Sequence, residues 1–243
     1  MCAVLAAAVG LQSARASRST LPDGFVYLRD IAPGIAQDMR YATPNNVIGR
    51  TLRGYQVGAC ILRRRAALAL KSAHEALKQS GLGLMVFDCY RPARAVADLV
   101  TYTQEADDRR SIYHPALPAG QLIDEGYIAK RSGHSTGLAV DLTLVRLSNP
   151  AVPGNQPAPS CGGPRSATEA DMGTGFDCFD PLAWAGAEVS PEQAANRGRL
   201  KDAMTAQGFA AYPREWWHFS LPPKNDMERQ AFDFEIVRGP AQR

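Results

Sequence analysis

Residues 132–141 read Ser-Gly-His-Ser-Thr-Gly-Leu-Ala-Val-Asp, and the rest of the chain is organised around them. They set His134 and Asp141 seven residues apart. Seven residues extend roughly 10 Å along a helix or about 23 Å along a strand, whereas two ligands of one metal ion nearly touch, so a shared metal requires a turn. Gly133 and Gly137 permit the positive φ angles of such a turn. The stretch fits half of a metal site, and it fits equally an ordinary glycine-rich hairpin with a surface aspartate and an unrelated histidine.

The residues after Gly137 alternate as a strand does. Leu138, Val140, Leu142 and Leu144 are expected to face a core. The opposite face then carries Ala139, Asp141 and Thr143, which are small or polar. We therefore expect Asp141 to point away from the core.

The composition is typical of a globular protein. The chain has 243 residues, of which 45% are hydrophobic and 21% charged, so it contains enough apolar side chains for a real core and predicts one domain, with two as the upper limit. The net charge of +3 is small, and no block of Lys and Arg argues for a nucleic-acid partner. No apolar run is long enough for a membrane-spanning helix. The sequence leaves the oligomeric state open.

The N-terminus resembles an export signal. Residues 3–11 are apolar, and Ala14-Arg15-Ala16 has the small-x-small form of a secretory cleavage site. These features predict a signal peptide over residues 1–16, a mature domain over 17–243 and a periplasmic or secreted location. No Lys or Arg precedes the apolar run, so a merely apolar N-terminus on a cytoplasmic protein is the alternative.

The cysteines are compatible with export. Loss of the leader removes Cys2 and leaves an even number, which suits an oxidising compartment: Cys60, Cys89, Cys161 and Cys178. Four cysteines permit three pairings, and four buried reduced thiols are the alternative.

Residues 149–175 predict a surface insertion loop, because they are rich in Pro, Gly, Ser and Ala and have no sustained periodicity. Cys161 lies in this loop and Cys178 just after it, so a disulfide between them would fix the insertion. Cys60 and Cys89 would form the other pair.

The other expected elements follow from periodicity and capping. They are strands at Phe25–Leu28, Ile35–Tyr41, Leu84–Phe87 and Phe209–Tyr212, and helices at Leu62–Ser80, from Ala93 to about Asp107, and from Pro191 to Gln207 behind a capping Ser190.

Arg91 stands between the strand ending at Phe87 and Pro92, which favours the first position of a helix. Side chains at such a junction often line a cleft, so we expect a site role for Arg91, with a surface charge as the alternative. His74 and His114 have no second ligand at helical spacing, and we expect packing and loop roles for them.

A second motif, Glu-Trp-Trp-His at residues 215–218, supplies the missing ligand. Catalytic zinc takes three protein ligands of His and carboxylate type, and His218 completes such a set with His134 and Asp141. Glu215 could then act as the general base. Residues three apart on a regular strand point to opposite faces, so Glu215 and His218 can share a site only if a bulge or the start of the strand reorients one of them. For Trp216, Trp217 and Phe219 we expect core packing.

Several other hydrolytic chemistries lack their residues. The chain has no HExxH helix, no GxSxG elbow and no SxxK triplet, and it has neither a GxGxxG motif nor a P-loop.

Four motifs together resemble the D-alanyl-D-alanine dipeptidases, the VanX-like zinc dipeptidases of the wider D-Ala-D-Ala peptidase and hedgehog fold group. They are Tyr-Ala-Thr-x-Asn-Asn at 41–46, Asp-x-Tyr-Arg-Pro at 88–92, Ser-x-His-x6-Asp at 132–141 and Glu-Trp-Trp-His at 215–218. Gly-Tyr at 54–55 and Phe-Asp-Phe at 232–234 extend the match over roughly residues 25–237.

The resemblance implies an α+β fold with a central antiparallel sheet flanked by helices, and one Zn²⁺ per chain on His134, Asp141 and His218. It also implies that Glu215 is the base and then the acid, and that Arg91 stabilises the negative charge of the tetrahedral intermediate.

The resemblance further implies that Asp177 holds the ammonium group of a small dipeptide, D-Ala-D-Ala. Ser132 and Tyr41 are implied as further substrate contacts.

Two departures from the family lie near the presumed specificity pocket: the long insertion, and Pro-Leu-Ala-Trp at residues 181–184 in place of Glu-Arg-Ser-His. They leave the dipeptide preference open. A carboxypeptidase or endopeptidase of the same fold that trims muropeptides, and a non-catalytic zinc module, are the alternatives. The physiological role, whether cell-wall turnover, nutrient use or glycopeptide resistance, is open as well.

Overall fold

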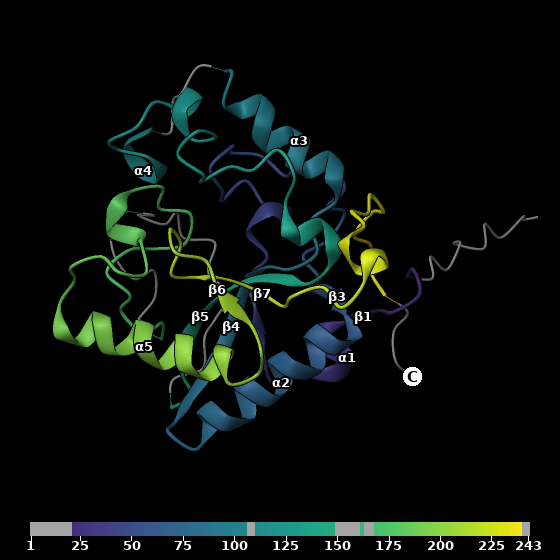
Figure 1. Cartoon of the computed structure of the whole chain (residues 1–243), viewed down its shortest axis with the longest axis vertical. Coiled ribbons are helices and arrows are strands. Elements are labelled where there is room, and N and C mark those ends of the chain that lie inside the picture. Colours follow the sequence, from purple (N-terminus) through teal and green to yellow (C-terminus); the bar gives the residue numbers. More distant parts are fainter. Residues whose placement is uncertain (1–20, 106–109, 149–160, 163–167, 240–243) are drawn as a thin grey trace, which may run out of the picture.

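The computed structural model describes residues 21–105, 110–148, 161–162 and 168–239. Its centre is a five-stranded sheet (Figure 1) with the strand order β2 (Ala36–Gln37), β4 (Leu82–Asp88), β5 (Ala139–Arg146), β7 (His218–Ser220) and β6 (Ala210–Ala211). All neighbouring strands are antiparallel except β2 and β4, which are parallel. A separate antiparallel pair is formed by β1 (Phe25–Tyr27) and β3 (Ile61–Arg63). The expected mixed α+β class is confirmed.

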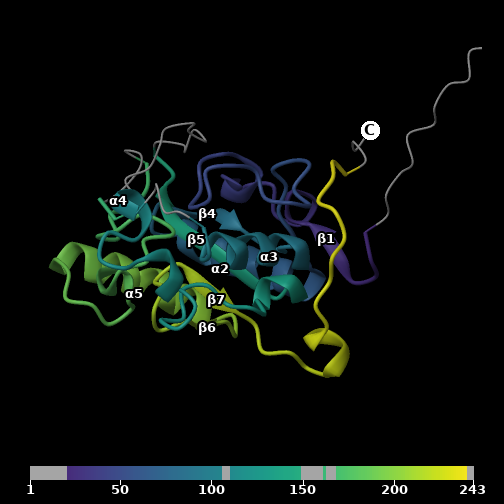
Figure 2. The same cartoon turned by 90° about the horizontal axis from the view of Figure 1, so that it is seen from above.

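Helices lie on both sides of this sheet. On one side α2 (Arg64–Lys78) packs on β4, α5 (Pro191–Thr205) packs on β5 and β6, and the two helices touch. On the other side lies α3 (Ala93–Tyr102), as Figures 1 and 2 show. The remaining described helical turns are α1 (Leu28–Ile31), α4 (Arg110–Tyr113), η1 (Arg40–Ala42), η2 (Ala119–Gln121), η3 (Gly133–Thr136), η4 (Pro181–Ala183) and η5 (Asp226–Arg229). No helix within the described ranges is both long enough and apolar enough to cross a membrane.

The start of helix α5 lies where the local sequence predicts it. Ser190 caps α5, accepting a hydrogen bond from the backbone N–H of Gln193, whose side chain returns a bond to the Ser190 backbone. This capping box satisfies two of the amide groups that a helix start leaves without partners. Pro191 follows as the first helical residue, as the sequence predicts.

Other predicted boundaries were wrong, because tertiary pairing overrides local pattern. The helix expected from Leu62 begins at Arg64, since residues 61–63 pair with β1 as strand β3. Of the strand expected over residues 35–41, only Ala36–Gln37 pairs, and Arg40–Ala42 is a helical turn. The helix expected to reach Asp107 ends at Tyr102.

The central strand β5 is buried on both faces, not on one. Residues 139–145 are all buried, including Asp141 and Thr143 on the face expected to be polar. The segment around Phe176 supplies a cover, with its ring stacked 4.9 Å from that of Phe87 and edge-on to Trp217 at 5.7 Å. Asp141 therefore points into a covered pocket and not to open solvent.

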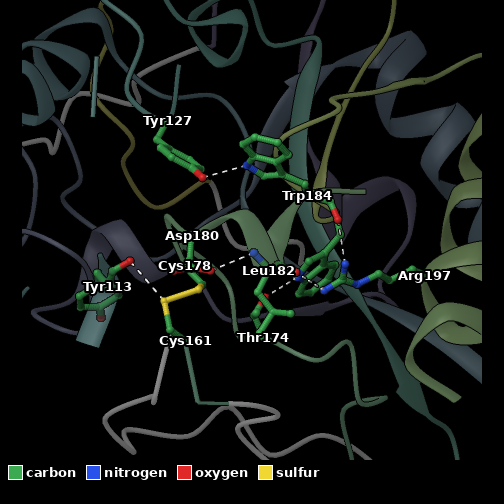
Figure 3. Close-up of a disulfide and its surroundings, with 10 residues drawn as sticks. Tyr113, Tyr127, Cys161, Thr174, Cys178, Asp180, Leu182, Trp184 and Arg197 are labelled. Atoms are coloured by element: carbon green, nitrogen blue, oxygen red, sulfur yellow. Dashed lines mark hydrogen bonds between the residues drawn. A yellow bond between two sulfur atoms is a disulfide. The ribbon is translucent and has the colours of Figure 1, made fainter. Parts of the chain in front are cut away.

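Two disulfides are present among the described residues. Cys60 bonds to Cys89 with a Cα–Cα distance of 5.3 Å, and Cys161 bonds to Cys178 with a Cα–Cα distance of 4.8 Å (Figure 3). These are the two pairs that the sequence favoured. The predicted signal peptide and most of the predicted insertion loop lie outside the described residues.

Candidate metal centre and active site

Three neighbouring strands bring two carboxylates and a histidine into one row. Asp141 of β5 lies directly opposite His218 of β7 and opposite Asp88 of β4. Residues directly opposite each other in an antiparallel pair point to the same face of the sheet. A register shift between Val86 and Asp88 is essential to this row, because the preceding register would place Asp88 opposite Val140, on the other face.

His134 reaches the row from the turn before β5. The side chain of Ser132 accepts a hydrogen bond from the His134 backbone N–H at 3.3 Å and so caps η3. Gly137 ends the turn at φ +75°, where a Cβ would overlap the ring of Phe25. The predicted turn between His134 and Asp141 is therefore present, and it depends on Gly137.

The imidazole of His134 is oriented by the backbone. Its Nδ1 donates to the carbonyl oxygen of Cys89 at 2.7 Å, which leaves Nε2 of the neutral ring with its lone pair directed at the site. A histidine that ligates a metal commonly donates its other ring nitrogen to a carbonyl in this way. Cys89 is itself held in the disulfide with Cys60.

The donor atoms of His134, Asp141 and His218 form a compact triangle. Nε2 of His134 lies 3.2 Å from Nδ1 of His218 and 3.2 Å from Oδ2 of Asp141, and Nδ1 of His218 lies 2.9 Å from Oδ1 of Asp141. Two ligands about 2.05 Å from a tetrahedral zinc ion lie about 3.4 Å apart, and these distances, which involve both oxygens of Asp141, are near that value. These three residues are a possible metal site.

Charge supports the same assignment. Burial alone would raise the pKa of Asp141, but His134 and His218 lower it below its usual range, so Asp141 is a carboxylate. Burial lowers the pKa of His218, against the opposing effect of Asp141, which favours the neutral ring that a metal requires.

Glu215 lies in the turn before β7, outside the strand. Its carbonyl accepts the backbone N–H of His218 at 3.2 Å, and its carboxylate comes within 3.8 Å of Nδ1 of His218. The start of the strand thus frees Glu215 from strand alternation. Burial, and then the charges of Asp141 and Asp177, raise the pKa of Glu215 well above its usual range, which suits a group that must gain and release a proton.

Arg91 is held beside the triangle. Its Nε donates to Oδ2 of Asp88 at 2.8 Å, its Nη2 lies 3.4 Å from Oδ2 of Asp141, and its guanidinium lies 4.7 Å from the centre of the Tyr41 ring. Asp88 is fully buried and also accepts a hydrogen bond from the Tyr55 hydroxyl at 2.7 Å. No role was expected for Asp88 from the sequence, although its place at the end of a buried strand was a usable signal.

The same pocket contains the expected substrate contacts. Tyr41, Ser132 and Asp177 line it together with Arg91, Glu215 and the donor triangle. The Tyr41 hydroxyl donates to Oδ2 of Asp177 at 2.9 Å. Burial and then the nearby carboxylate of Asp141 raise the pKa of Asp177 to about 7.

Another wall of the pocket was not expected from the sequence. It is formed by Tyr127, Phe179 and Tyr212, and Leu99 of α3 also contributes. None of these aromatic residues lies in a motif that indicates chemistry.

The two other histidines do not reach the site. Nδ1 of His74 accepts the backbone N–H of Leu84 at 3.1 Å, so His74 packs α2 on β4, as expected. His114 lies in the loop after α4, as expected, and it is fully buried, with Nε2 2.7 Å from the Tyr102 hydroxyl and Nδ1 2.8 Å from the carbonyl oxygen of Leu117.

A triangle of two imidazoles and a carboxylate, next to a buried glutamate and a fixed arginine, defines a candidate mononuclear metallohydrolase. Comparison with known sequences then identifies the family. The chain belongs to the D-Ala-D-Ala dipeptidase family, whose sequence profile matches residues 22–152 and 165–237. The resemblance of the four motifs is thereby confirmed, and the unmatched residues 153–164 fall within the predicted insertion.

Individual relatives match most of the length of this chain. A D-alanyl-D-alanine dipeptidase of Streptomyces coelicolor is 34% identical over 216 residues, which cover 88% of this chain and 98% of that protein. One from Enterococcus faecium is 33% identical over 217 residues, covering 88% and 98%. One from Escherichia coli is 31% identical over 198 residues, covering 81% and 84%.

Proposed function

We propose that this chain is a zinc-dependent D,D-dipeptidase that hydrolyses the free dipeptide D-Ala-D-Ala. The observation that carries the proposal is the donor triangle of His134, Asp141 and His218, with Glu215 and Arg91 directly beside it. Membership of the D-Ala-D-Ala dipeptidase family supports the substrate. One zinc ion per chain would be held by the three residues of the triangle.

Zinc at such a site lowers the pKa of a bound water toward neutrality and polarises the scissile carbonyl. Glu215 takes the proton of the attacking water and passes it to the leaving amine. Its buried position supports both roles, because the raised pKa allows the carboxyl group to hold the proton between the two steps.

Arg91 stabilises the negative charge that develops on the carbonyl oxygen. Its two neighbours, Asp88 and Asp141, fix the guanidinium before the substrate arrives, so little reorganisation is needed during the reaction.

The N-terminal ammonium of the dipeptide pairs with Asp177. Tyr41 donates to one oxygen of Asp177 and leaves the other free for this contact. Ser132 lines the same pocket, and its hydroxyl, which accepts a hydrogen bond from the His134 backbone, can donate its proton to a polar group of the substrate. An anchored ammonium favours a free dipeptide over a longer peptide.

The test is a comparison of metal content and turnover. Glu215→Ala is expected to retain stoichiometric zinc and to lose nearly all release of D-alanine, because the variant keeps the donor triangle and lacks the base. The exposed Glu188→Ala provides a matched control outside the site, with unchanged zinc and turnover. A chelator should abolish the activity and added zinc should restore it.

Three results would contradict the proposal. Unaltered turnover in Glu215→Ala removes the mechanism. Faster cleavage of a muropeptide pentapeptide than of the free dipeptide indicates a carboxypeptidase or endopeptidase. Stoichiometric zinc without hydrolysis of any of these peptides indicates a non-catalytic module.

We further infer that residues 17–243 form a single domain of the hedgehog and D,D-peptidase type, with residues 149–175 as a surface loop. We also infer export to the periplasm or the medium after cleavage behind residue 16, where the enzyme would act on cell-wall peptides. The two disulfides support an oxidising location. The N-terminal sequence of the protein purified from cell fractions tests export, and an uncleaved protein in the cytoplasm would contradict it.

A further inference from the structure

The wall of the pocket that includes Tyr127 is a loop and not part of the sheet. Residues 126–129 follow η2 and line the same pocket as the donor triangle. Tyr127 is buried, with 7% of its surface exposed. The backbone N–H groups of Tyr127 and Ile128 both donate to the carbonyl oxygen of Leu122, which keeps the turn compact. The loop belongs to neither of the described sheets, so its contacts with distant parts of the chain are made through side chains.

The indole of Trp184 provides one such contact. Its Nε1–H donates to the Tyr127 hydroxyl at 2.8 Å (Figure 3). The Tyr212 hydroxyl donates to the carbonyl oxygen of Gly126 at 2.9 Å, and Arg214 donates to the carbonyl oxygen of Glu125. Three side chains from later in the chain thus bind the loop, and one of them, Tyr212, also lines the pocket.

Trp184 is itself anchored to the body of the domain. Its carbonyl oxygen accepts a hydrogen bond from Nη1 of Arg197 at 2.8 Å, and Nη2 of that buried guanidinium donates to the carbonyl oxygen of Leu182 (Figure 3). Nε of Arg197 donates to the carbonyl oxygen of Met172. The Arg214 guanidinium lies 5.4 Å from the centre of the Trp184 ring. Arg197 thus fixes the backbone of Trp184, while the indole, which is 36% exposed, is held by its hydrogen bond to Tyr127 and by the Arg214 guanidinium.

Tyr127 meets a second aromatic residue on the pocket surface. Its ring centre lies 5.5 Å from that of Phe179, two residues beyond Asp177, and Cys178 between them is held in a disulfide with Cys161. All three of Tyr127, Phe179 and Asp177 line the pocket. The substituent next to the anchored ammonium must therefore lie close to this aromatic pair.

The pocket is small. Its cavity is about 150 Å³, which is room for on the order of ten waters. Rigid walls are needed if such a cavity is to discriminate by size, because a loosely held side chain would move aside.

We propose that Tyr127, held by the indole of Trp184, is a specificity-determining wall that restricts the N-terminal residue of the dipeptide to a small side chain. This inference rests on the proposed dipeptidase function. Trp184 is a positioning residue, since it acts on the substrate only through Tyr127.

The experiment compares kcat/KM for D-Ala-D-Ala, D-Val-D-Ala and D-Ala-D-Val. Tyr127→Ala is expected to raise the ratio of D-Val-D-Ala to D-Ala-D-Ala by about tenfold or more, the range in which added methylene groups are discriminated by an apolar pocket. The ratio of D-Ala-D-Val to D-Ala-D-Ala is expected to stay within about twofold, because the wall faces the other residue.

Trp184→Phe keeps an aromatic ring and removes the Nε1–H donor. It should raise the D-Val-D-Ala ratio by a smaller factor, and this effect should disappear when Tyr127 is already alanine, as expected for side chains that act through each other. Leu182→Ala is the matched control from η4, because that side chain is exposed and does not line the pocket. Tyr127→Leu serves if the alanine variant does not fold.

The outcomes separate this inference from the proposed function. A wild-type enzyme that cleaves D-Ala-D-Ala, with unchanged ratios in Tyr127→Ala or Tyr127→Leu, overturns the inference alone. An equal gain for D-Ala-D-Val overturns the assignment of the wall to the N-terminal residue. A folded, zinc-loaded wild type that cleaves none of the three dipeptides overturns both proposals.

Discussion

Removal of the disulfide between Cys60 and Cys89 should weaken both the fold and the metal site. The bond joins the residue before β3 to the residue after β4, and both cysteines are buried. The perturbation is the double variant Cys60→Ala/Cys89→Ala, which leaves the Cys89 backbone carbonyl in the chain. That carbonyl accepts the hydrogen bond that orients His134.

The size of the stability loss follows from the sequence separation of 29 residues. With the chain-entropy relation for crosslinks, closing a loop of this length restricts the unfolded chain by about 3.6 kcal/mol at 25 °C. For the metal, we expect an affinity up to about tenfold lower, the low end for a weakened outer-shell contact to a ligating histidine.

The assay is urea denaturation of wild type and variant in the presence of a chelator, so that bound metal does not contribute to the free energy of unfolding. Zinc affinity is measured separately by competition with a chromophoric chelator. The matched control is Cys161→Ala/Cys178→Ala, whose sequence separation of 17 residues gives about 3.1 kcal/mol by the same relation. Its carbonyls do not contact His134, so its zinc affinity should be unchanged.

Two results would refute this reasoning. If the free energy of unfolding of Cys60→Ala/Cys89→Ala falls by less than about 1 kcal/mol, the crosslink does not restrict the unfolded chain as calculated. An equal loss of zinc affinity in both variants would show that the Cys89 carbonyl has no particular effect on His134.

Two further predictions concern stability. Burial raises the pKa of Glu169 from 4.5 to about 7, so its contribution to stability is fully present below about pH 4.5 and is lost as the pH rises through 7. In urea denaturation, the free energy of unfolding of Glu169→Gln should therefore equal that of wild type near pH 4 and exceed it by on the order of 3 kcal/mol at pH 8.5. An equal difference at both pH values would show that ionisation of the buried carboxyl group is not the cause. Gly137→Ala should lower the free energy of unfolding clearly more than Gly81→Ala does. Both glycines have positive φ, but only at Gly137 would the new Cβ overlap a ring, that of Phe25. Gly81→Ala alone should cost about 1–2 kcal/mol, and equal thermal shifts for the two variants would exclude the overlap.

Local sequence determined more of the site than of the fold boundaries. The glycines around His134 and the capping Ser190 were readable from the sequence because each acts on residues a few positions away. The turn at Gly137 follows from its own backbone freedom. For the same reason, the sequence marked residues 215–218 as a candidate site before any strand was placed.

The strands were harder to delimit from sequence. Residues 61–63 carry the apolar pattern of a helix start, yet they pair with β1. The two faces of β5 could not be distinguished as core and surface, because the cover over Asp141 comes from the segment around Phe176, far along the chain.

The tertiary structure alone decided how the functional groups meet. Asp141 and His218 are 77 residues apart, and only the register of β5 with β7 sets them side by side. The register shift before Asp88 turns that carboxylate to the same face, and the contact from Trp184 to Tyr127 joins two loops with no shared motif. Such long-range pairings depend on the packing of the whole chain, whereas caps and turns depend on their immediate neighbours. For this reason the sequence alone determined the types of the candidate ligands, and the tertiary structure determined their geometry.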